Sequence, residues 1–261
     1  MLRAIVTIIA MTLIVIFFGI PTLLIGLVYP ARPVVAACSL IWARAILICS
    51  GVRMTVEGKE HLFDGVPRFF MGNHQSALDI PILMAALNGD VRFLAKNTLF
   101  RIPIFGWVMF RYGYVPIHRG NARITLRTLE EMLRHLRHKP ISFAVFPEGT
   151  RSRDGRLLVF RRGTMKIARR SGLDVVPFSI DGSVAVHHRD HLYRATPGPV
   201  KLVFGEPIPA KQVAAMSATK LHRHVVETVS RQLGHPVGLS LRADASDATA
   251  SDHSLVTSEK T

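Results

Sequence analysis

The feature of this sequence that most constrains its fold is a long apolar run near the N-terminus. No charged residue occurs between positions 4 and 31, and the first acidic residue of the chain is Glu57. About 20 apolar residues suffice for a helix to cross a bilayer, so Ala4–Val28 is long enough to span one. Pro21 would kink or end that helix and leave a re-entrant or interfacial segment instead. The run also exceeds the roughly 7–15 apolar residues of a secretory signal, so we expect a retained membrane anchor.

A second apolar stretch, Val34–Gly51, contains one charge, Arg44, whose long side chain can reach the membrane surface. We therefore expect residues 1–51 to form a membrane-anchoring helical segment. The basic residues that follow the first run are Arg32, Arg44, Arg53 and Lys59, whereas Arg3 alone precedes it. Basic residues favour the cytoplasmic side, which predicts an inner or cytoplasmic membrane protein whose main domain faces the cytoplasm. If both stretches cross the bilayer, this asymmetry carries less weight.

The chain is both apolar and strongly basic. Hydrophobic residues make up 49% of it, and 33 Lys and Arg against 18 Asp and Glu give a formal net charge of +15. This combination indicates anionic membrane lipids, phosphorylated lipids or acidic carrier proteins as partners. Nucleic acid would explain the charge but not the apolar excess, so we expect no nucleic-acid partner. Cys38 and Cys49 would lie about 16 Å apart along a helix, which is too far for a disulfide.

From about residue 52, short apolar runs alternate with amphipathic stretches. Runs rich in Val, Ile and Phe predict strands at Arg68–Met71, Arg92–Ala95, Tyr112–Ile117, Ile141–Phe146, Val175–Ile180 and Lys201–Phe204. Apolar residues at helical spacing predict helices at Ile80–Leu87, Ala122–Arg137, Gly163–Arg170 and Lys211–Leu233. This alternation predicts a single layered α/β domain, residues 52–235, with a mixed sheet flanked by helices. Residues 236–261, rich in Ala, Ser, Asp and Thr, predict a disordered tail.

The stretch NHQSALDIP, Asn73–Pro81, places a histidine five residues before an aspartate. Residues five apart on an uninterrupted helix point about 140° away from each other, so His74 and Asp79 meet only if the backbone bends. A bend is expected, because Ser76 or Asp79 can cap a helix and Pro81 is best tolerated in a first turn. A carboxylate on one imidazole nitrogen raises the basicity of the other, as a general base requires. The spacing also fits two structural residues at a helix start.

The stretch FPEGTRS, Phe146–Ser152, follows an apolar run that predicts a strand. A Pro-Glu-Gly turn with Arg151 and Arg153 can bring main-chain NH groups and a guanidinium to a phosphate. The same residues would equally form a surface turn with solvated charges.

Between these two stretches, Ala95–Asn121 places Lys96 and Arg119 on either side of an apolar, aromatic centre. Phe105 and Trp107 in that centre either pack into the core or lie at a membrane interface, where tryptophan is favoured.

Three later stretches are less specific. VPFSI, Val176–Ile180, predicts a buried strand whose Pro177 marks a sheet edge or a bulge. HHRDH, His187–His191, has two histidines at a zinc-binding spacing, but no cysteine or acidic cluster completes a site, so we expect a solvated loop and no metal. Residues 151–170 hold eight bases and one acid, which form either a solvated face or a platform for anionic lipids or an acidic carrier protein.

Taken in order, four of these stretches resemble the four sequence blocks of the glycerolipid acyltransferase family, particularly the members that acylate 1-acyl-sn-glycerol-3-phosphate. NHQSALD matches the family's His-x4-Asp block, IPIFGW with GYVPIHR matches the second, FPEGTRS the third and VPFSI the fourth. The resemblance covers about residues 68–180. The second block departs from the pattern, because Thr98 stands where the family often has a glutamate.

The resemblance implies a role for each matching residue. His74 would act as general base on the free hydroxyl of the acceptor, and Asp79 would orient His74. The implied substrate-binding residues are Lys96, Arg119, Glu148, Gly149 and Arg151. No acyl-enzyme is implied, because Ser76 lacks the Gly-x-Ser-x-Gly setting of a nucleophile elbow.

Together these expectations describe a membrane-bound acyltransferase of phospholipid biosynthesis. It would move a fatty acyl group from acyl-CoA or acyl carrier protein to the sn-2 hydroxyl of 1-acyl-sn-glycerol-3-phosphate, giving phosphatidate. A thioester is already activated, so no metal or redox cofactor is expected. The alternatives are acylation of another lyso-lipid, such as lyso-ornithine lipid or a lysophospholipid, and a basic membrane-binding protein without catalysis.

Overall fold

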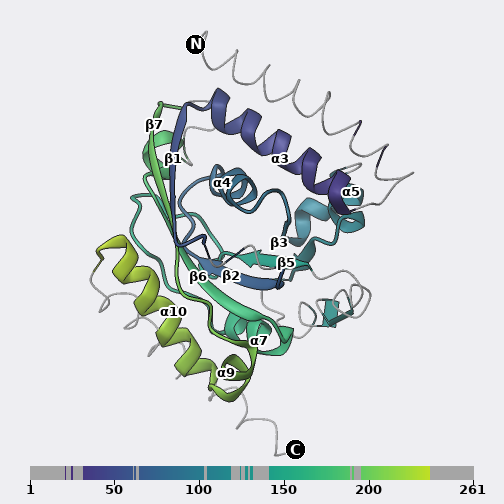
Figure 1. Cartoon of the computed structure of the whole chain (residues 1–261), viewed down its shortest axis with the longest axis vertical. Coiled ribbons are helices and arrows are strands. Elements are labelled where there is room, and N and C mark those ends of the chain that lie inside the picture. The colour runs from purple at the N-terminus through teal and green to yellow at the C-terminus, as the bar shows by residue number, and fades with distance from the viewer. Residues whose placement is uncertain are drawn as a thin grey trace, which may run out of the picture.

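The architecture is a single mixed sheet with helices on both faces (Figure 1). The computed structural model describes residues 32–60, 62, 65–102, 105–118, 141–188 and 195–235, together with residues 21, 25, 124, 127, 128, 130, 131 and 190. The strands are β1 (Val52–Glu57), β2 (Arg68–Gly72), β3 (Val91–Lys96), β4 (Val115–Ile117), β5 (Ser142–Val145), β6 (Asp174–Asp181) and β7 (Gly198–Phe204). Their order in the sheet is β1-β7-β6-β2-β5-β3-β4, and only the pair β6–β7 is antiparallel. The predicted α/β fold with a mixed, helix-flanked sheet is confirmed.

The helices form two layers. On one face of the sheet lie α3 (Arg32–Cys49) and α4 (Asp79–Ala86), and on the other lie α7 (Arg162–Ser171), α9 (Ala210–Ala215) and α10 (Ala218–Leu233) (Figure 1). Three shorter helices, η2 (Asn97–Arg101), α5 (Phe105–Arg111) and α8 (Ser183–Val186), follow strands β3 and β6.

Side chains of the central strands alternate between two buried clusters, one on each face of the sheet. In β2, Phe70 packs with α3 and α4, whereas its neighbours Phe69 and Met71 pack with α7 and α10. Successive strand residues point to opposite faces, and because both faces are covered, β2 is apolar throughout rather than alternating. On α10, Leu221 and Val225 are fully buried one helical turn apart, as an amphipathic helix requires.

The predicted elements differ from the structure in a helix that is divided and in a strand that was missed. The single helix predicted over Lys211–Leu233 is two helices, because α9 ends at Ala215 and α10 begins at Ala218. Ser217 starts α10 by accepting a hydrogen bond from the Lys220 amide at 3.1 Å. Strand β1 was not predicted at all. Of the helix predicted at Ala122–Arg137, only residues 124, 127, 128, 130 and 131 are described, and all of them are helical.

Pro177 lies in the interior of the sheet, so its predicted edge position is wrong. β6 pairs with β2 on one side and with β7 on the other. Val175 pairs with Ile208, and Phe178 pairs with Phe204. Between these two pairs β6 advances three residues, whereas the segment opposite it, residues 204–208, advances four. The segment 204–208 therefore forms a bulge opposite Pro177, where the Gly205 amide donates to the Pro177 carbonyl at 2.7 Å. Proline has no NH to donate, and Pro177 lies where the hydrogen-bond ladder between β6 and residues 204–208 is already interrupted.

Most of the predicted membrane anchor falls on residues that are not described. The predicted span Ala4–Val28 lies outside the described residues except for Pro21 and Ile25, which are helical. Within the described part of the chain, no helix combines the length and the apolar character that a membrane crossing needs. The predicted tail, residues 236–261, lies wholly outside the described residues.

Helix α3, the described part of the predicted anchor, is buried on one side only. Ala43 and Leu47 pack into the cluster shared with α4. On the opposite side, Ile41 is 48% exposed and Ile48 is 78% exposed. Cys38 and Cys49 are free thiols in α3.

Candidate active site

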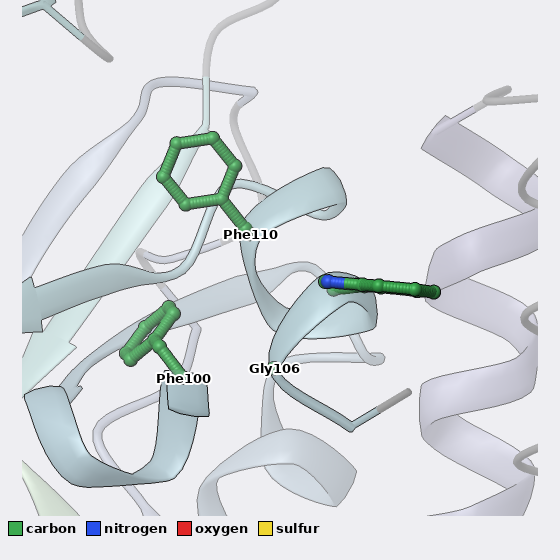
Figure 2. A pocket seen from close by; sticks show the side chains of 4 residues that line it. Phe100, Gly106 and Phe110 are labelled. Carbon is green, nitrogen blue, oxygen red and sulfur yellow. The ribbon is translucent and has the colours of Figure 1, made fainter. Parts of the chain in front are cut away.

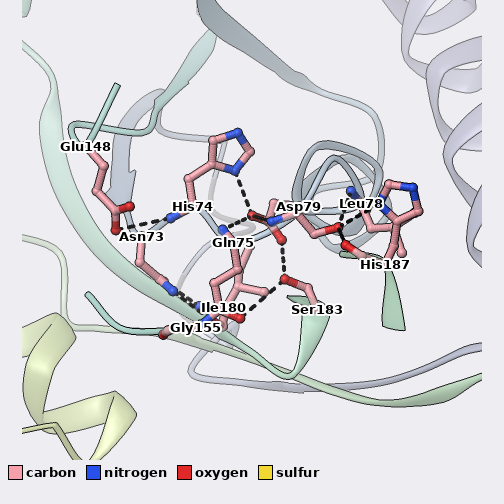
Figure 3. A network of polar contacts seen from close by, with 11 residues as sticks. Asn73, His74, Gln75, Leu78, Asp79, Glu148, Gly155, Ile180, Ser183 and His187 are labelled. Atoms are coloured by element: carbon pink, nitrogen blue, oxygen red, sulfur yellow. Dashed lines mark hydrogen bonds and ion pairs between the residues drawn. The ribbon is translucent and has the colours of Figure 1, made fainter. Parts of the chain in front are cut away.

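The candidate site lies where the chain leaves β2 and enters α4. His74 Nδ1 lies 2.7 Å from Asp79 Oδ2, so the predicted contact between the two side chains is confirmed (Figure 3). The backbone bends between them, and the Asp79 amide donates to the Ser76 carbonyl at 3.3 Å. Pro81 falls in the first turn of α4 as predicted, but the N-cap is Leu78, so the predicted capping by Ser76 or Asp79 is wrong.

The Asp79 carboxylate is fully buried and surrounded by donors. Besides His74, its Oδ2 accepts hydrogen bonds from the amides of Gln75 at 2.7 Å and Ser76 at 2.9 Å. Its Oδ1 accepts from Ser183 Oγ at 2.6 Å. A carboxylate only accepts hydrogen bonds, so His74 Nδ1 carries the proton in this contact and Nε2 presents its lone pair.

One ring nitrogen of His74 faces Asp79, and the other nitrogen points away from this network (Figure 3). The ring stacks on Phe146 with a centroid distance of 4.0 Å and an interplanar angle of 13°. The side chain is 15% exposed, and no described residue forms a hydrogen bond with Nε2. A fixed ring with one open, unprotonated nitrogen is what a general base needs.

The FPEGTRS loop and the residues just after it are fastened to the His74 loop by three hydrogen bonds. The Ser152 amide donates to the His74 carbonyl at 2.7 Å, and the His74 amide donates to Glu148 Oε1 at 3.3 Å. Gln75 Nε2 donates to the Gly155 carbonyl at 3.0 Å. The first and third sequence blocks, more than 70 residues apart, therefore form one rigid unit.

Glu148 is a buried carboxyl group behind His74. It is 4% exposed, and its Oε2 has no hydrogen-bond partner among the described residues. Burial raises the pKa of Glu148 well above its usual value. The amides of His74 and Leu158 oppose this shift, and the nearby Asp79 carboxylate adds to it.

Gly149 turns the loop through a left-handed conformation, with φ +68°. A Cβ at this position would lie 2.8 Å from Nε of Arg161, so the guanidinium lies against the Gly149 backbone. The Arg161 amide also donates to the Pro147 carbonyl at 3.0 Å. Sequence reasoning placed Arg161 only in a general basic segment, because a separation of 12 residues carries no local signal for this contact.

Of the other predicted substrate-binding residues, the structure describes Lys96 and Arg151 but not Arg119. Lys96 is exposed at the carboxyl end of β3, the same sheet edge from which the His74 and Glu148 loops emerge. No hydrogen bond or ion pair between described residues joins Lys96 to the site. Arg151 is half-buried in the FPEGTRS loop. Arg119 lies outside the described residues.

Strand β6, which carries the fourth block, holds the His74 loop from the other side. Asn73 Nδ2 donates to the Ile180 carbonyl at 2.7 Å, and the Ile180 amide donates to Asn73 Oδ1 at 2.8 Å. This paired contact continues the β2–β6 ladder by one side chain beyond its last pair, Gly72–Phe178. The fourth block is therefore part of the support of the site as well as of the core.

The HHRDH segment is only partly solvated. His187 is 5% exposed, and its carbonyl accepts a hydrogen bond from Ser76 Oγ at 2.7 Å, so the prediction of a solvated loop is wrong for this residue. Ser76 is itself fully buried. His191 lies outside the described residues. Where the structure is described, no three His, Cys, Asp or Glu side chains form a group that could hold a metal ion.

A separate apolar pocket of about 310 Å³ lies on η2 and α5, lined by Phe100, Gly106, Trp107 and Phe110 (Figure 2). Trp107 is 72% exposed and Phe110 is 60% exposed. The core position considered for Trp107 is therefore wrong, and its position at a membrane interface stays a prediction. Nothing is described of the Phe105 side chain.

Comparisons with known proteins agree with this geometry. A family model described as Acyltransferase matches residues 53–181. Over 169 residues the chain is 35% identical to the 1-acyl-sn-glycerol-3-phosphate acyltransferase LPAT1, chloroplastic, of Arabidopsis thaliana, covering 64% of this chain and 47% of the relative. It is 27% identical to the human 1-acyl-sn-glycerol-3-phosphate acyltransferase alpha, covering 70% of this chain and 65% of the relative. The chain spans about half the length of the plant and algal relatives that it matches.

The fold is also that of a solved structure. The crystal structure of the 1-acyl-sn-glycerophosphate (LPA) acyltransferase PlsC from Thermotoga maritima superposes with a TM-score of 0.75 at 27% identity, covering 89% of this chain and 94% of that chain. The agreement in fold, the domain match and the shared name of the relatives show that residues 53–181 form an Acyltransferase family domain.

Proposed function

We propose that this protein transfers a fatty acyl group from a thioester to the sn-2 hydroxyl of 1-acyl-sn-glycerol-3-phosphate and so produces phosphatidate. The observation that carries this proposal is the His74 imidazole, held at Nδ1 by a buried carboxylate 2.7 Å away and open at Nε2. The relatives named above support the choice of acceptor, since their names specify this lyso-lipid.

The proposed chemistry needs one base and no covalent enzyme intermediate. His74 Nε2 takes the proton of the acceptor hydroxyl while that oxygen attacks the thioester carbonyl carbon. The tetrahedral intermediate then collapses, the C–S bond breaks, and the leaving thiolate takes the proton back from Nε2. The products are the ester and a free thiol, either CoA or the thiol of a carrier protein. The positive charge on His74 exists only between these steps, and Asp79 stabilises it.

The acceptor phosphate is proposed to bind at the FPEGTRS loop. Arg151 and Arg161 supply guanidinium groups there, and the tight turn at Gly149 exposes backbone to an incoming ligand. Lys96 and Arg119 are proposed as further cationic contacts. We assign Glu148 to holding the His74 loop, because its Oε1 accepts a hydrogen bond from the His74 amide and its side chain is 4% exposed.

A lipid substrate must reach the site from a membrane, so we propose that the protein works at the cytoplasmic face of a membrane through its apolar N-terminal segment. The exposed apolar side chains of α3 and α5 support this placement. In both Figure 1 and Figure 2, α3 runs beside α5.

The test is an activity panel with the purified protein in detergent or vesicles. Acyl-CoA and acyl carrier protein serve as donors, and lysophosphatidate, lysophosphatidylcholine and lyso-ornithine lipid serve as acceptors. We expect phosphatidate from the wild type and a loss of at least about 1,000-fold in H74A, with an unchanged melting temperature. H224A is the matched control, because His224 is exposed on α10 and should keep full activity. An active H74A would overturn the proposed mechanism.

The same panel tests the second acceptor class. Thr98, in place of a glutamate that the family often has, is exposed in η2 after β3. If a lyso-lipid without a phosphomonoester is acylated faster than lysophosphatidate, the acceptor assignment changes while the role of His74 stands.

A further inference from the structure

The two oxygens of the Asp79 carboxylate are held by different parts of the fold. Oδ2 receives three donors, all from the loop that carries Asp79 itself: His74 Nδ1 and the amides of Gln75 and Ser76. Oδ1 receives Ser183 Oγ at 2.6 Å, and among the described residues no other group donates to it. A hydroxyl at this distance from a buried carboxylate forms a charge-assisted hydrogen bond.

Ser183 is placed there by a turn that only glycine can form. Gly182 ends β6 with φ +84°, and a Cβ on it would lie 2.6 Å from the carbonyl oxygen of Pro199 in β7. The next residue, Ser183, is fully buried and starts α8. Its hydroxyl also lies 3.5 Å from Gln75 Oε1, but it has a single proton, which goes to the shorter contact with the charged oxygen.

We infer that Ser183 is a positioning residue of the acyl-transfer site, so that the working unit is the chain Ser183–Asp79–His74 rather than a histidine–aspartate pair (Figure 3). The inference rests on the proposed function. Ser183 does not contact the substrate, because it is fully buried behind Asp79. It fixes the plane of the carboxylate, and with it the direction of the imidazole.

Ser183 has a second, electrostatic effect. A donor on Oδ1 withdraws negative charge from the carboxylate, which weakens the stabilisation that Asp79 gives to a protonated His74. When this donor is removed, the carboxylate stabilises protonated His74 more strongly, and the base is blocked by a proton at a higher pH. The acidic limb of the pH–rate profile should therefore move upward, while kcat falls because the carboxylate is less firmly held.

The test compares S183A, S183C and S230A with the wild type in the acyl-transfer assay. S183C keeps the bulk of the side chain but offers only a weak donor. S230A is the matched control, because Ser230 is also fully buried but its hydroxyl has no partner among the described residues. Glu148 also lies beside His74, so the pH profiles are repeated in an E148Q background.

We expect kcat to fall roughly tenfold in S183A and nearly as much in S183C, with KM values within about twofold of the wild type. The acidic limb should move to higher pH in both variants and in both backgrounds, and S230A should match the wild type in activity and profile. If S183C is as active as the wild type, the role of Ser183 is packing and the inference is wrong. It is also wrong if S183A keeps the wild-type kcat and profile while H74A is inactive, a result that leaves the proposed function intact. Inactive wild type with every donor and acceptor would instead reject the proposed function.

Discussion

The edge of the sheet that carries the candidate active site and the outer surface of α3 and α5 are built in opposite ways. At the candidate-site edge, Asp79 is fully buried and its carboxylate accepts hydrogen bonds from His74, Gln75, Ser76 and Ser183. On the outer surface, by contrast, large apolar side chains lie in the open, with Ile48 78% exposed and Trp107 72% exposed. One region buries polar groups and the other exposes apolar ones.

Each arrangement is unfavourable in water unless something compensates for it. Buried polar groups are tolerated only when they are hydrogen-bonded, and at the candidate-site edge they are. Exposed apolar groups that gather on one surface indicate contact with another apolar phase. If the proposed function is right, the difference means that acyl transfer depends on internal hydrogen bonding, whereas access of the lipid depends on an exposed surface. Mutations in the two regions should therefore have different signatures.

The largest effect is expected where the internal bonding is densest. D79N replaces an oxygen that accepts hydrogen bonds with an NH₂ group that faces other donors. We expect activity to fall about 10,000-fold and the free energy of unfolding to fall by about 2–4 kcal/mol. The measurements are acyl transfer and urea unfolding. D181N is the control, since Asp181 is exposed at the end of β6 and should change neither. A stable, active D79N would mean that the dense bonding around Asp79 has no catalytic purpose.

A smaller loss is expected at Gly149, where the loop meets a guanidinium. G149A adds a Cβ that must displace Arg161 and also strains a backbone at φ +68°. G172A is the matched control, because Gly172 has φ +69° and open space around its Cβ position. Both variants should lose about 1 kcal/mol of stability. Only G149A should raise the KM for lysophosphatidate, roughly tenfold. Equal KM values in the two variants would remove Arg161 from the phosphate site.

On the outer surface of α3 and α5, a mutation should leave the stability unchanged and lower activity only with a membrane-bound substrate. The double variant W107S/F110S removes two exposed side chains, so stability should change by less than about 0.5 kcal/mol. Acylation of long-chain lysophosphatidate in vesicles should fall about three- to tenfold, while a short-chain, water-soluble acceptor should be used normally. V66S, which changes another exposed apolar residue just before β2, should affect neither substrate. Equal losses with both acceptors would show that these residues serve the chemistry instead.

The smallest effect is a pH dependence of stability at Glu148. Its pKa is raised by burial, so the folded state binds a proton more tightly than the unfolded state. Stability is therefore lost as the pH rises from the ordinary value of Glu148, 4.5, through the raised one. E148Q cannot titrate, so its Tm relative to the wild type should increase by roughly 2–4 °C across this range. A Tm difference that stays constant with pH would contradict the burial of a charge at this position.

The sequence predicted what depends on neighbouring residues. His74 and Asp79 are five apart, and the residues between them favour the bend that joins them. The apolar strands were also visible, because strands buried on both faces are continuously apolar. β1 escaped notice because Val52, Met54 and Val56 alternate with charged and polar residues at the edge of the sheet. This alternation is the pattern of a half-buried strand. The prediction relied on continuous apolar runs, which β1 does not have.

The contacts that hold the site together could not be predicted, because they join distant segments. Nothing near Asp79 in the sequence indicates Ser183, and nothing near Asn73 indicates Ile180. Each of these pairs depends on β6 lying beside β2, which is a property of the whole sheet. His187 was misjudged for the same reason, since Ser76 contacts it across 111 positions of the chain.

The separation of 104 residues between Asp79 and Ser183 has a consequence for the life of the protein in the cell. During synthesis the histidine and its aspartate emerge from the ribosome long before the serine and the strand that carry the second half of their support. A nascent chain, or a fragment cut before residue 183, has all the chemical groups of the first and third blocks but not the framework that aligns them. Alignment of the His74 and Asp79 side chains is thus tied to completion of the sheet, and under the proposed function an unfinished chain would not consume acyl thioesters.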